Sequence, residues 1–371
     1  MALVRMNPAL AHFSLAMSLK ILSWLPVKAL LRFRCVCKSW KSLMLDLSFV
    51  KLHLQRSYCR DTPVLFTLLN SNSKEEQCSL HYYCSMQRLL DNPLSAIDDG
   101  DLPFNQKYNV VGVCNGLVRL SALTHEVSGT TLQKGRRFWN PATRLRSKKS
   151  PCIMCYIHTL IGFGYNDSSD TYKVVAVVKK SRAITELRVC CLGDNCWRKI
   201  ATWTDFLRAI HTKGLFMSNT LNWVGRLYTT HQNAIFSFDI RKETYRYLSL
   251  PVDVDVLSDD TVIGVLGGCL CLSHDYKRTR LAIWQMKEFG VEKSRTPLKK
   301  VSYEHLQIST SSSWMAMHAN GDVRLVASKS EFGLVLYNRR ENRVKPNGMF
   351  SKTVILESTQ YVESLVLPYR I

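Results

Sequence analysis

The hydrophobic positions of the first 55 residues recur at steps of three and four, which is the spacing of an amphipathic helix. We expect a first helix over residues 15–24 and a second that begins at Pro26, because proline suits the first turn of a helix. The apolar stripe of the second helix comprises Leu30, Phe33, Cys37, Trp40 and Met44, widened by Leu31 and Val36. Residues 46–56 form a third piece, either helical or extended. Helices this short need tertiary packing, so part of their apolar surface is expected to contact a partner.

From about residue 110 onward the pattern changes to short apolar runs separated by polar, turn-prone residues, which predicts strands. Upstream, residues 64–68 also read as a strand, and a second apolar run extends to Tyr83. Residues 91–109 read as a turn-rich loop. The sequence GVCNGLVRLS that starts at Gly112 has a relative, GVLGGCLCLS, that starts at Gly264. This offset corresponds to about three units of a ~50-residue repeat.

A finer repeat points to one hairpin in each unit. Five apolar strands, each followed by a polar stretch, are centred on Trp139, Cys190, Phe238, Trp284 and Tyr337. The return strands are expected seven residues later, at Arg146, Trp197, Tyr245, Val291 and Val344. Four-stranded antiparallel sheets with their turns take about 40 to 50 residues, and such sheets arranged radially form a β-propeller.

We therefore predict a small all-α N-terminal domain followed by an all-β, propeller-like domain. Six blades are expected, with segments 60–107 and 345–371 supplying the sixth by joining strands from the two ends of the chain, which protects an open edge. The expected division is 1–55 for the helices, 56–109 for a linker with the first strands, and 110–371 for the β domain. A pair of packed β-sandwiches is the structural alternative.

The N-terminal residues, from about 13 to 55, resemble the F-box. The resemblance is carried by Ile21-Leu22, Leu25-Pro26-Val27-Lys28, Leu30-Leu31, Val36-Cys37-Lys38, Trp40, Leu43 and residues 49–53. In that family the helices dock on a Skp-type adaptor, which links the protein to a cullin-RING ubiquitin ligase. The resemblance implies an adaptor-binding face drawn from Leu25, Pro26, Leu30, Leu31, Val36, Cys37 and Trp40. Leu30 and Trp40 suit the domain core equally well. The opening segment, residues 13–20, lacks the proline and the carboxylates that are usual in the family.

The β region resembles the F-box-associated domain of plant F-box proteins. The matching stretches are 113–117 (VCNGL), 138–144 (FWNPATR), 162–166 (GFGYN), 172–175 (YKVV), 197–198 (WR), 221–223 (LNW) and 236–239 (FSFD). They follow the family's order. Kelch repeats carry a double glycine in each unit, whereas here only Gly267-Gly268 occurs, so the F-box-associated label is favoured over kelch proper.

The chain has 371 residues and 46% hydrophobic content, enough for a large core and more than one domain. Its 50 Lys and Arg against 29 Asp and Glu give a net charge of +21, which suits nucleic acid or another acidic partner. The densest basic run lies at 134–149 and includes Phe138 and Trp139, which could stack bases. A solvated face, with both aromatic rings buried in the strand repeat, is the plainer interpretation.

Neither metal chemistry nor catalysis is indicated. The thirteen cysteines are scattered, and Cys152-Ile-Met-Cys155 has no second pair at zinc-finger spacing. Reduced thiols indicate the cytosol or the nucleus. No run of about 18 apolar residues predicts a membrane span, and no nucleotide-binding loop or hydrolase motif is present. We expect no catalytic, metal-binding or cofactor-binding residues and no cofactor.

The sequence therefore favours a non-catalytic substrate receptor of an SCF-type ubiquitin ligase. Its helices would bind a Skp-type adaptor, and its β domain would bind a target protein that the sequence does not identify. The alternative is a protein- or nucleic-acid-binding propeller that works without a ligase, which the altered segment 13–20 favours. Nucleic acid is the less favoured partner and a membrane is not expected.

Overall fold

A computed structural model describes most of the helical region and of the β domain. The described residues are Met17 and residues 19–59, 63–70, 79–85, 108–122, 126–127, 130–132, 137–148, 150–151, 153–156, 159–181, 184–254, 257–258, 261–306, 318–320, 323–328, 333–338, 342–347 and 353–369. Residues 13–16, 60–62 and 91–107, on which several sequence expectations fall, lie outside them.

The N-terminal region is helical, as predicted, but its second helix is divided. Residues 19–22 are helical and are followed by α2 (Val27–Phe33), α3 (Lys38–Leu43) and α4 (Leu47–Ser57). The prediction of one helix running on from Pro26 was wrong, because the chain turns at residues 34–36 and Cys37 is extended. The Cys37 thiol then caps α3 by accepting the Trp40 N–H at 3.5 Å. Asp46 caps α4 in the same way, which settles residues 46–56 as helix.

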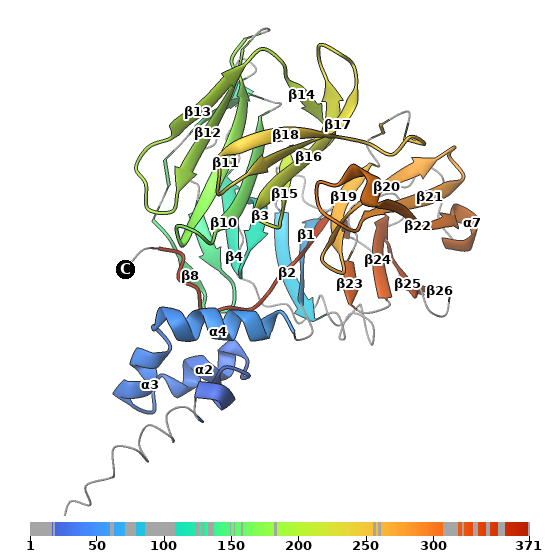
Figure 1. The fold of residues 1–371 in the computed structure, drawn as a ribbon. Coiled ribbons are helices and arrows are strands. Elements are labelled where there is room, and N and C mark those ends of the chain that lie inside the picture. Colours follow the sequence, from blue (N-terminus) through green and yellow to red (C-terminus); the bar gives the residue numbers. More distant parts are fainter. Residues whose placement is uncertain are drawn as a thin grey trace, which may run out of the picture.

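The described residues that follow the helices form mainly antiparallel sheets arranged as a propeller-like β domain (Figure 1). The first unit comprises β3 (Tyr108–Cys114), β4 (Leu117–Ala122), β7 (Arg137–Asn140) and β8 (Leu145–Arg146). The second comprises β10 (Leu160–Asn166), β11 (Thr171–Lys179), β12 (Thr185–Cys191) and β13 (Arg198–Trp203). The third comprises β15 (Lys213–Met217), β16 (Thr220–Leu227), β17 (Asn233–Asp239) and β18 (Thr244–Ser249), with β14 (Leu207–Ala209) beside β16.

The later units complete the domain. The fourth comprises β19 (Val262–Leu266), β20 (Cys269–Tyr276), β21 (Arg280–Met286) and β22 (Arg295–Ser302), with a 3-10 turn at Glu292–Ser294 and α7 (Tyr303–Leu306). The fifth comprises β23 (His318–Asn320), β24 (Val323–Ser328), β25 (Gly333–Asn338) and β26 (Arg343–Asn347). The sixth joins β27 (Thr353–Gln360) to β1 (Pro63–Asn70) and β2 (Ser79–Ser85). A small separate sheet comprises β5 (Glu126–Val127), β6 (Thr130–Leu132) and β9 (Met154–Tyr156).

The sixth unit closes the ring with strands from both ends of the chain. β27 pairs antiparallel with β1, which in turn pairs with β2, so the predicted joining of the two termini is confirmed. The second and third units are also joined directly, because their first strands, β10 and β15, pair in parallel at two positions. Sheets that are closed in this way leave few unpaired strand edges.

The predicted hairpins hold in most units and fail in one. Trp139 pairs with Arg146, Phe238 with Tyr245 and Tyr337 with Val344, as expected. In the second unit the last pair is Val189 with Arg198, one step inside the predicted pair. In the fourth, Trp284 pairs with Pro297 rather than Val291. Residues 287–294 form a longer connection there, with the short 3-10 turn, and this moves the return strand along the chain.

The related sequences at 112–121 and 264–273 form equivalent hairpins. Cys114 pairs with Leu117 in one, and Leu266 pairs with Cys269 in the other. Each turn has two residues with positive φ, Asn115-Gly116 at 51° and 78° and Gly267-Gly268 at 56° and 73°. Such turns match the twist of the flanking strands. The internal repeat that the sequence suggested is therefore structural.

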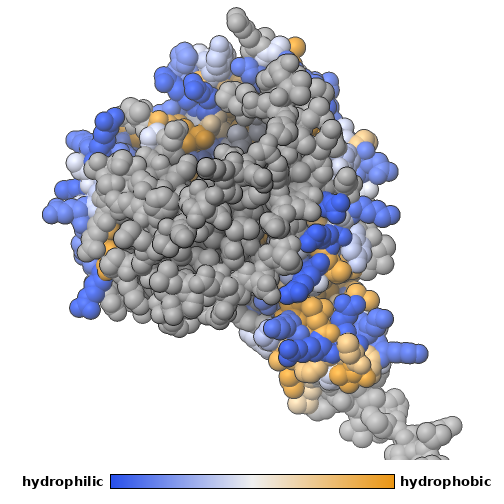
Figure 2. Space-filling view, turned by 180° about the vertical axis from the view of Figure 1, so that it is seen from behind, coloured by the Kyte–Doolittle hydropathy of each residue, from blue (hydrophilic) through white to orange (hydrophobic). Residues whose placement is uncertain are grey.

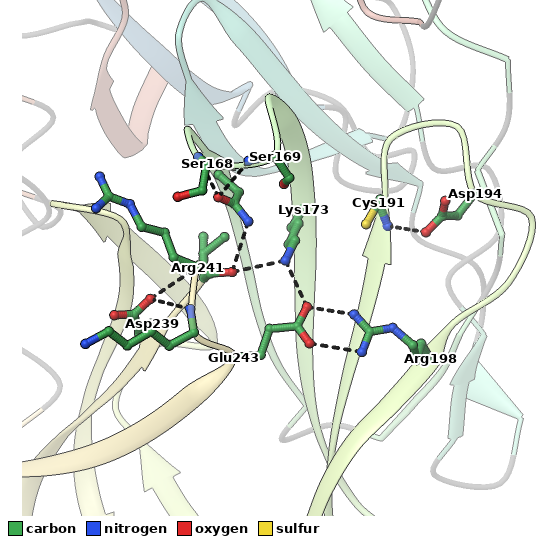
Figure 3. Close-up of polar contacts among 12 residues, drawn as sticks. Ser168, Ser169, Lys173, Cys191, Asp194, Arg198, Asp239, Arg241 and Glu243 are labelled. Atoms are coloured by element: carbon green, nitrogen blue, oxygen red, sulfur yellow. Dashed lines mark hydrogen bonds and ion pairs between the residues drawn. The ribbon is translucent and has the colours of Figure 1, made fainter.

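A polar network joins the second and third units along their shared side (Figure 3). Lys173, on β11, donates to the carboxylate of Glu243 at 2.8 Å and to the carbonyl of Ile240 at 3.1 Å. Arg198, on β13, makes two further hydrogen bonds to the same carboxylate, at 2.6 and 2.9 Å. The Lys173 side chain is only 8% exposed, so Glu243 neutralises a nearly buried charge. The hydrogen bond from Arg198, together with the Lys173 charge, lowers the pKa of Glu243.

Candidate docking face and interdomain junction

The helical domain, residues 17–59, has a small core that is completed from the far end of the chain. Its buried residues are Leu22, Val27, Leu30, Met44, Phe49 and Val50, joined by Leu365. The imidazole of His53 is also buried and lies 2.9 Å from the carbonyl oxygen of Leu25, which ties α4 to the turn before α2. The core therefore depends on a residue that follows the last strand.

The structure divides the seven residues predicted to face an adaptor. Leu30 is fully buried, so it belongs to the core rather than to the surface. Leu25, Leu31 and Trp40 are half-buried and pack against that core. Pro26, Val36 and Cys37 are exposed, and the Val36 side chain is 64% exposed. Only these last three are free to contribute most of their side chains to a docking face.

A second set of exposed apolar residues was missed by the sequence reasoning. Met17, Ile21 and Trp24 are 53%, 61% and 52% exposed, and Leu45 and Leu47 are exposed as well. The first three recur at steps of four and three, which is a helical stripe on the side opposite Leu19 and Leu22. That spacing was the available signal. Figure 2 shows hydrophobic residues gathered on the helical domain among hydrophilic ones.

The helical domain is basic around this apolar surface. Exposed cations are Lys20, Lys28, Arg32, Lys38 and Lys41. The acid that accompanies them is Asp46, whose carboxylate accepts the Phe49 N–H at 3.0 Å as the cap of α4. Arg56 lies 5.0 Å from the centre of the Trp24 ring and supports its exposed indole. A partner of this face is therefore expected to present apolar side chains with carboxylates around them.

The helix α4 lies across one end of the β domain (Figure 1). Lys51 donates to Asp170 at 2.8 Å, and the Tyr58 hydroxyl donates to the Asn115 side chain at 3.0 Å. The Lys51 contact lowers the pKa of Asp170, whereas burial raises the pKa of Tyr58. A cavity of about 590 Å³ lies beside these contacts, lined by α4, by the turn between β10 and β11 and by residues 365–369. Two parts of the molecule meet there without filling all the space.

The basic run that raised a nucleic-acid alternative does not present its aromatic rings. Phe138 and Trp139 are each 2% exposed, so neither can stack on a base. Arg144, Arg146 and Lys148 are exposed beside them, while residues 134–136 and Lys149 lie outside the described part. The plainer interpretation, a solvated basic face over buried aromatic side chains, is confirmed for these two residues.

Within the described residues, no cluster of three or more histidine, cysteine, aspartate or glutamate side chains could hold a metal ion. Cys152, one half of the C-x-x-C pair, is not among those residues. Among the helices that the structure describes, none is long and apolar enough to cross a membrane.

Comparison with known proteins agrees with both regions. A family model described as the F-box associated beta propeller domain matches residues 64–356, and the model of the F-box domain matches residues 12–52. The former confirms the F-box-associated label that the scarcity of double glycines favoured.

Several proteins of one plant are similar to this chain over most of their length. An F-box/kelch-repeat protein of Arabidopsis thaliana is 27% identical over an alignment that covers 96% of each chain. F-box protein CPR1 of the same plant is 27% identical over 307 residues, covering 73% of this chain and 68% of that protein. A putative F-box protein, also from Arabidopsis thaliana, is 23% identical over 350 residues, covering 91% and 86%. The chain therefore belongs to the plant F-box proteins, with an F-box domain followed by an F-box-associated β-propeller domain.

Proposed function

We propose that this protein is the substrate-receptor subunit of an SCF-type cullin-RING ubiquitin ligase. The F-box docks on a Skp-type adaptor, and the β domain binds the protein to be ubiquitylated. The receptor performs no bond chemistry itself. It raises the effective concentration of the target near the ubiquitin-loaded enzyme.

The observation that carries this proposal is the density of exposed apolar side chains on the helical domain. Of thirteen large hydrophobic residues that are exposed in the described part of the chain, seven lie between Met17 and Tyr58, and Leu45, Leu47 and Tyr58 of these border the junction with the β domain. That segment is about a fifth of the residues whose side chains the structure describes. Monomeric proteins rarely expose large apolar patches, and such patches mark sites of protein contact. The basic rim adds selectivity for an acidic partner.

The β domain supports a binding role rather than a catalytic one. The first strands of five units, β3, β10, β15, β19 and β23, contain no aspartate or glutamate, whereas β27 of the sixth unit contains Glu357. Enzymatic sites at the centre of a propeller need carboxylates or metal ligands that converge from several blades. Acidic residues are therefore missing from the first strands of five of the six units.

We also place the protein in a reducing compartment, the cytoplasm or the nucleus or both. Seven of the cysteines that the structure describes are free thiols: Cys35, Cys37, Cys59, Cys114, Cys191, Cys196 and Cys269. Disulfides are rare in those compartments, and free thiols are what they maintain.

The test is adaptor capture by purified variants of the full-length chain. Replacing both Ile21→Asp and Val36→Asp puts charges on two exposed apolar side chains, so we expect at least a tenfold loss of affinity for a Skp-type adaptor with the fold intact. Leu30 is unsuitable for this test because it is buried in the core. Val252→Asp is the matched control, since Val252 is 96% exposed on the β domain and should have no effect.

Unchanged capture by the double variant refutes this docking face. If the folded wild-type chain binds no adaptor at all, the ligase-independent alternative replaces the receptor proposal.

A further inference from the structure

The C-terminal residues 361–369, which we call the strap, leave β27 and run between the β domain and the helical domain (Figure 1). We propose that the strap sets the orientation of the F-box on the β domain, with Asn140 as the positioning residue that holds it. The effect of this orientation on ubiquitin transfer rests on the proposed function above. The proposal that the strap fixes the orientation does not.

The strap is anchored in the β domain by buried polar contacts. Tyr361 and Ser364 are fully buried. The side-chain amide of Asn140 donates to the carbonyl of Ser364 at 2.9 Å and to that of Val366 at 2.8 Å. The Ser364 hydroxyl donates to the carbonyl of Asn115 at 2.8 Å. Buried hydrogen bonds that lose one partner leave the other unsatisfied, so this anchor is costly to break.

The turn at Gly116 is shaped to receive the strap. A Cβ atom on Gly116 would lie 2.2 Å from the Ser364 hydroxyl oxygen and 2.6 Å from the Val362 carbonyl oxygen. Its φ of +78° is also unfavourable for any other residue. The close approach of the strap therefore requires glycine in the turn that follows β3.

The other side of the strap completes the helical domain. Leu365 is 4% exposed and packs in the core with Leu22, Leu30 and Phe49, and Val366 packs beside it. Leu365 stands between Ser364 and Val366, whose carbonyls Asn140 holds. Moving the strap out of the β domain therefore also withdraws a core side chain from the F-box.

Among the described residues, the other contacts between the domains are Ala142, a small side chain in the turn after β7 that packs on the helical core, and a few exposed polar pairs. The Lys51 and Asp170 side chains are 52% and 45% exposed, and ion pairs this exposed contribute little. Tyr58 and Asn115 contribute one neutral hydrogen bond. The cavity at the junction shows that packing between α4 and the neighbouring turn is incomplete. The strap is thus the main structural reason for one fixed orientation.

Asn140 combines two roles that can be separated by substitution. Its oxygen accepts the N–H groups of Ala142 and Thr143 at 3.0 and 3.3 Å, which forms the turn after β7. Its amide nitrogen donates to the two strap carbonyls, and its oxygen also accepts the Tyr361 hydroxyl of the strap at 3.5 Å, a contact that aspartate would keep. Asn166 forms the same turn after β10, accepting from Ser168 and Ser169 at 3.0 and 3.4 Å, but its nitrogen faces the Ile240 carbonyl of the third unit at 3.5 Å. The two asparagines form the same turn, but the Asn140 nitrogen donates two hydrogen bonds to the strap, whereas the Asn166 nitrogen donates one to another unit of the β domain.

The experiment compares Asn140→Asp with Asn166→Asp in the full-length chain. Aspartate keeps the oxygen that forms the turn but replaces the donor with an acceptor that repels the strap carbonyls. For Asn140→Asp we expect amide hydrogen exchange to accelerate at least about tenfold in both 361–369 and α4, and the radius of gyration from small-angle X-ray scattering to increase. Asn166→Asp should change neither measurement. The thermal unfolding of β10 to β18 should be retained in Asn140→Asp.

Faster exchange in the strap with unchanged α4 exchange and scattering overturns the proposal, because the F-box then keeps its orientation without the strap. If Asn140→Asp does not fold, Leu365→Ser replaces it, with Val252→Ser as control. Amide hydrogen exchange in α4 and small-angle X-ray scattering are measured again. A Leu365→Ser chain with wild-type values of both also overturns the proposal.

A ligase assay then tests the consequence. In a reconstituted ligase with adaptor and cullin-RING components, the receptor's own lysines that receive ubiquitin are mapped by mass spectrometry. With adaptor concentrations that saturate both chains, we expect the wild-type chain to be modified at a restricted set of lysines and Asn140→Asp at a broader set. A change in exchange and scattering without a change in this pattern supports the structural claim, that the strap fixes the orientation, and refutes its consequence for ubiquitin transfer. Absence of adaptor binding by the wild type refutes the proposed function alone.

Discussion

Apolar surface is buried to different extents in the helical domain and in the second and third units of the β domain. The F-box leaves many large hydrophobic side chains exposed and takes Leu365 from the other end of the chain to complete its core. The two β units bury nearly all of theirs, and Trp223 packs against Gly162 and Gly214 with no room for a Cβ atom at either. The F-box does not bury its apolar surface by itself, whereas the two β units do. This difference indicates that the F-box is the region with apolar surface available to a partner.

The largest expected effect is the difference in stability loss between two tryptophan-to-alanine substitutions, one in each region. Trp223→Ala removes a buried indole that donates to the Thr212 carbonyl at 3.2 Å, so we expect a loss of about 3–5 kcal/mol in the free energy of unfolding. Trp24→Ala removes an exposed indole and should cost less than about 1 kcal/mol. Urea denaturation followed by circular dichroism measures both. Equal losses would contradict the contrast between the two regions.

An intermediate loss of stability is expected from Glu243→Gln, which removes the carboxylate that pairs with Lys173 and Arg198 between the two β units. We expect a loss of roughly 1–3 kcal/mol at pH 7, because Lys173 then keeps a nearly buried charge without its counterion. The pKa of Glu243 is lowered from 4.5 in the folded state, so its contribution is present above about pH 4.5 and disappears as the pH falls through the folded value. Urea denaturation from pH 7 to pH 3 should show the two proteins converging at low pH.

The smallest effect is expected at the junction. Lys51→Ala breaks an ion pair whose two side chains are about half exposed, so we expect a loss of less than about 1 kcal/mol, reduced further by salt. Thermal unfolding at low and high salt measures it. A loss comparable with that of Glu243→Gln would show that α4 is held by charge rather than by the strap.

The fold was largely readable from the sequence, because strands of fixed period and paired turns are local signals. Spacing alone predicted the strand partners of Phe238 and Tyr337 correctly, but not that of Trp284. The longer connection after Trp284 changes the spacing without changing the apolar pattern. The docking face was less predictable. Leu30 and Val36 both lie on an apolar stripe, and only the packing of α2, α4 and Leu365 decides that one is buried and the other exposed.

The strap was beyond sequence reasoning for a further reason. Asn140 is a turn residue by its local sequence, and nothing nearby shows that its amide binds a segment more than 220 residues away. Contacts of that kind carry no periodic signal. The pairing of β1 with β27 was inferred only because an open propeller edge requires some such closure.

The placement of Leu365 has a consequence for the protein during its synthesis. The F-box is translated first, but one of its core side chains is added 343 residues after Leu22, which corresponds to roughly 20 to 70 s of elongation at about 5–20 residues per second. Over that interval the nascent helices lack a finished core. A chain that ends early, through a premature stop codon or a stalled ribosome, never acquires Leu365. The helical domain can thus complete its core only on a chain that has been translated as far as Leu365.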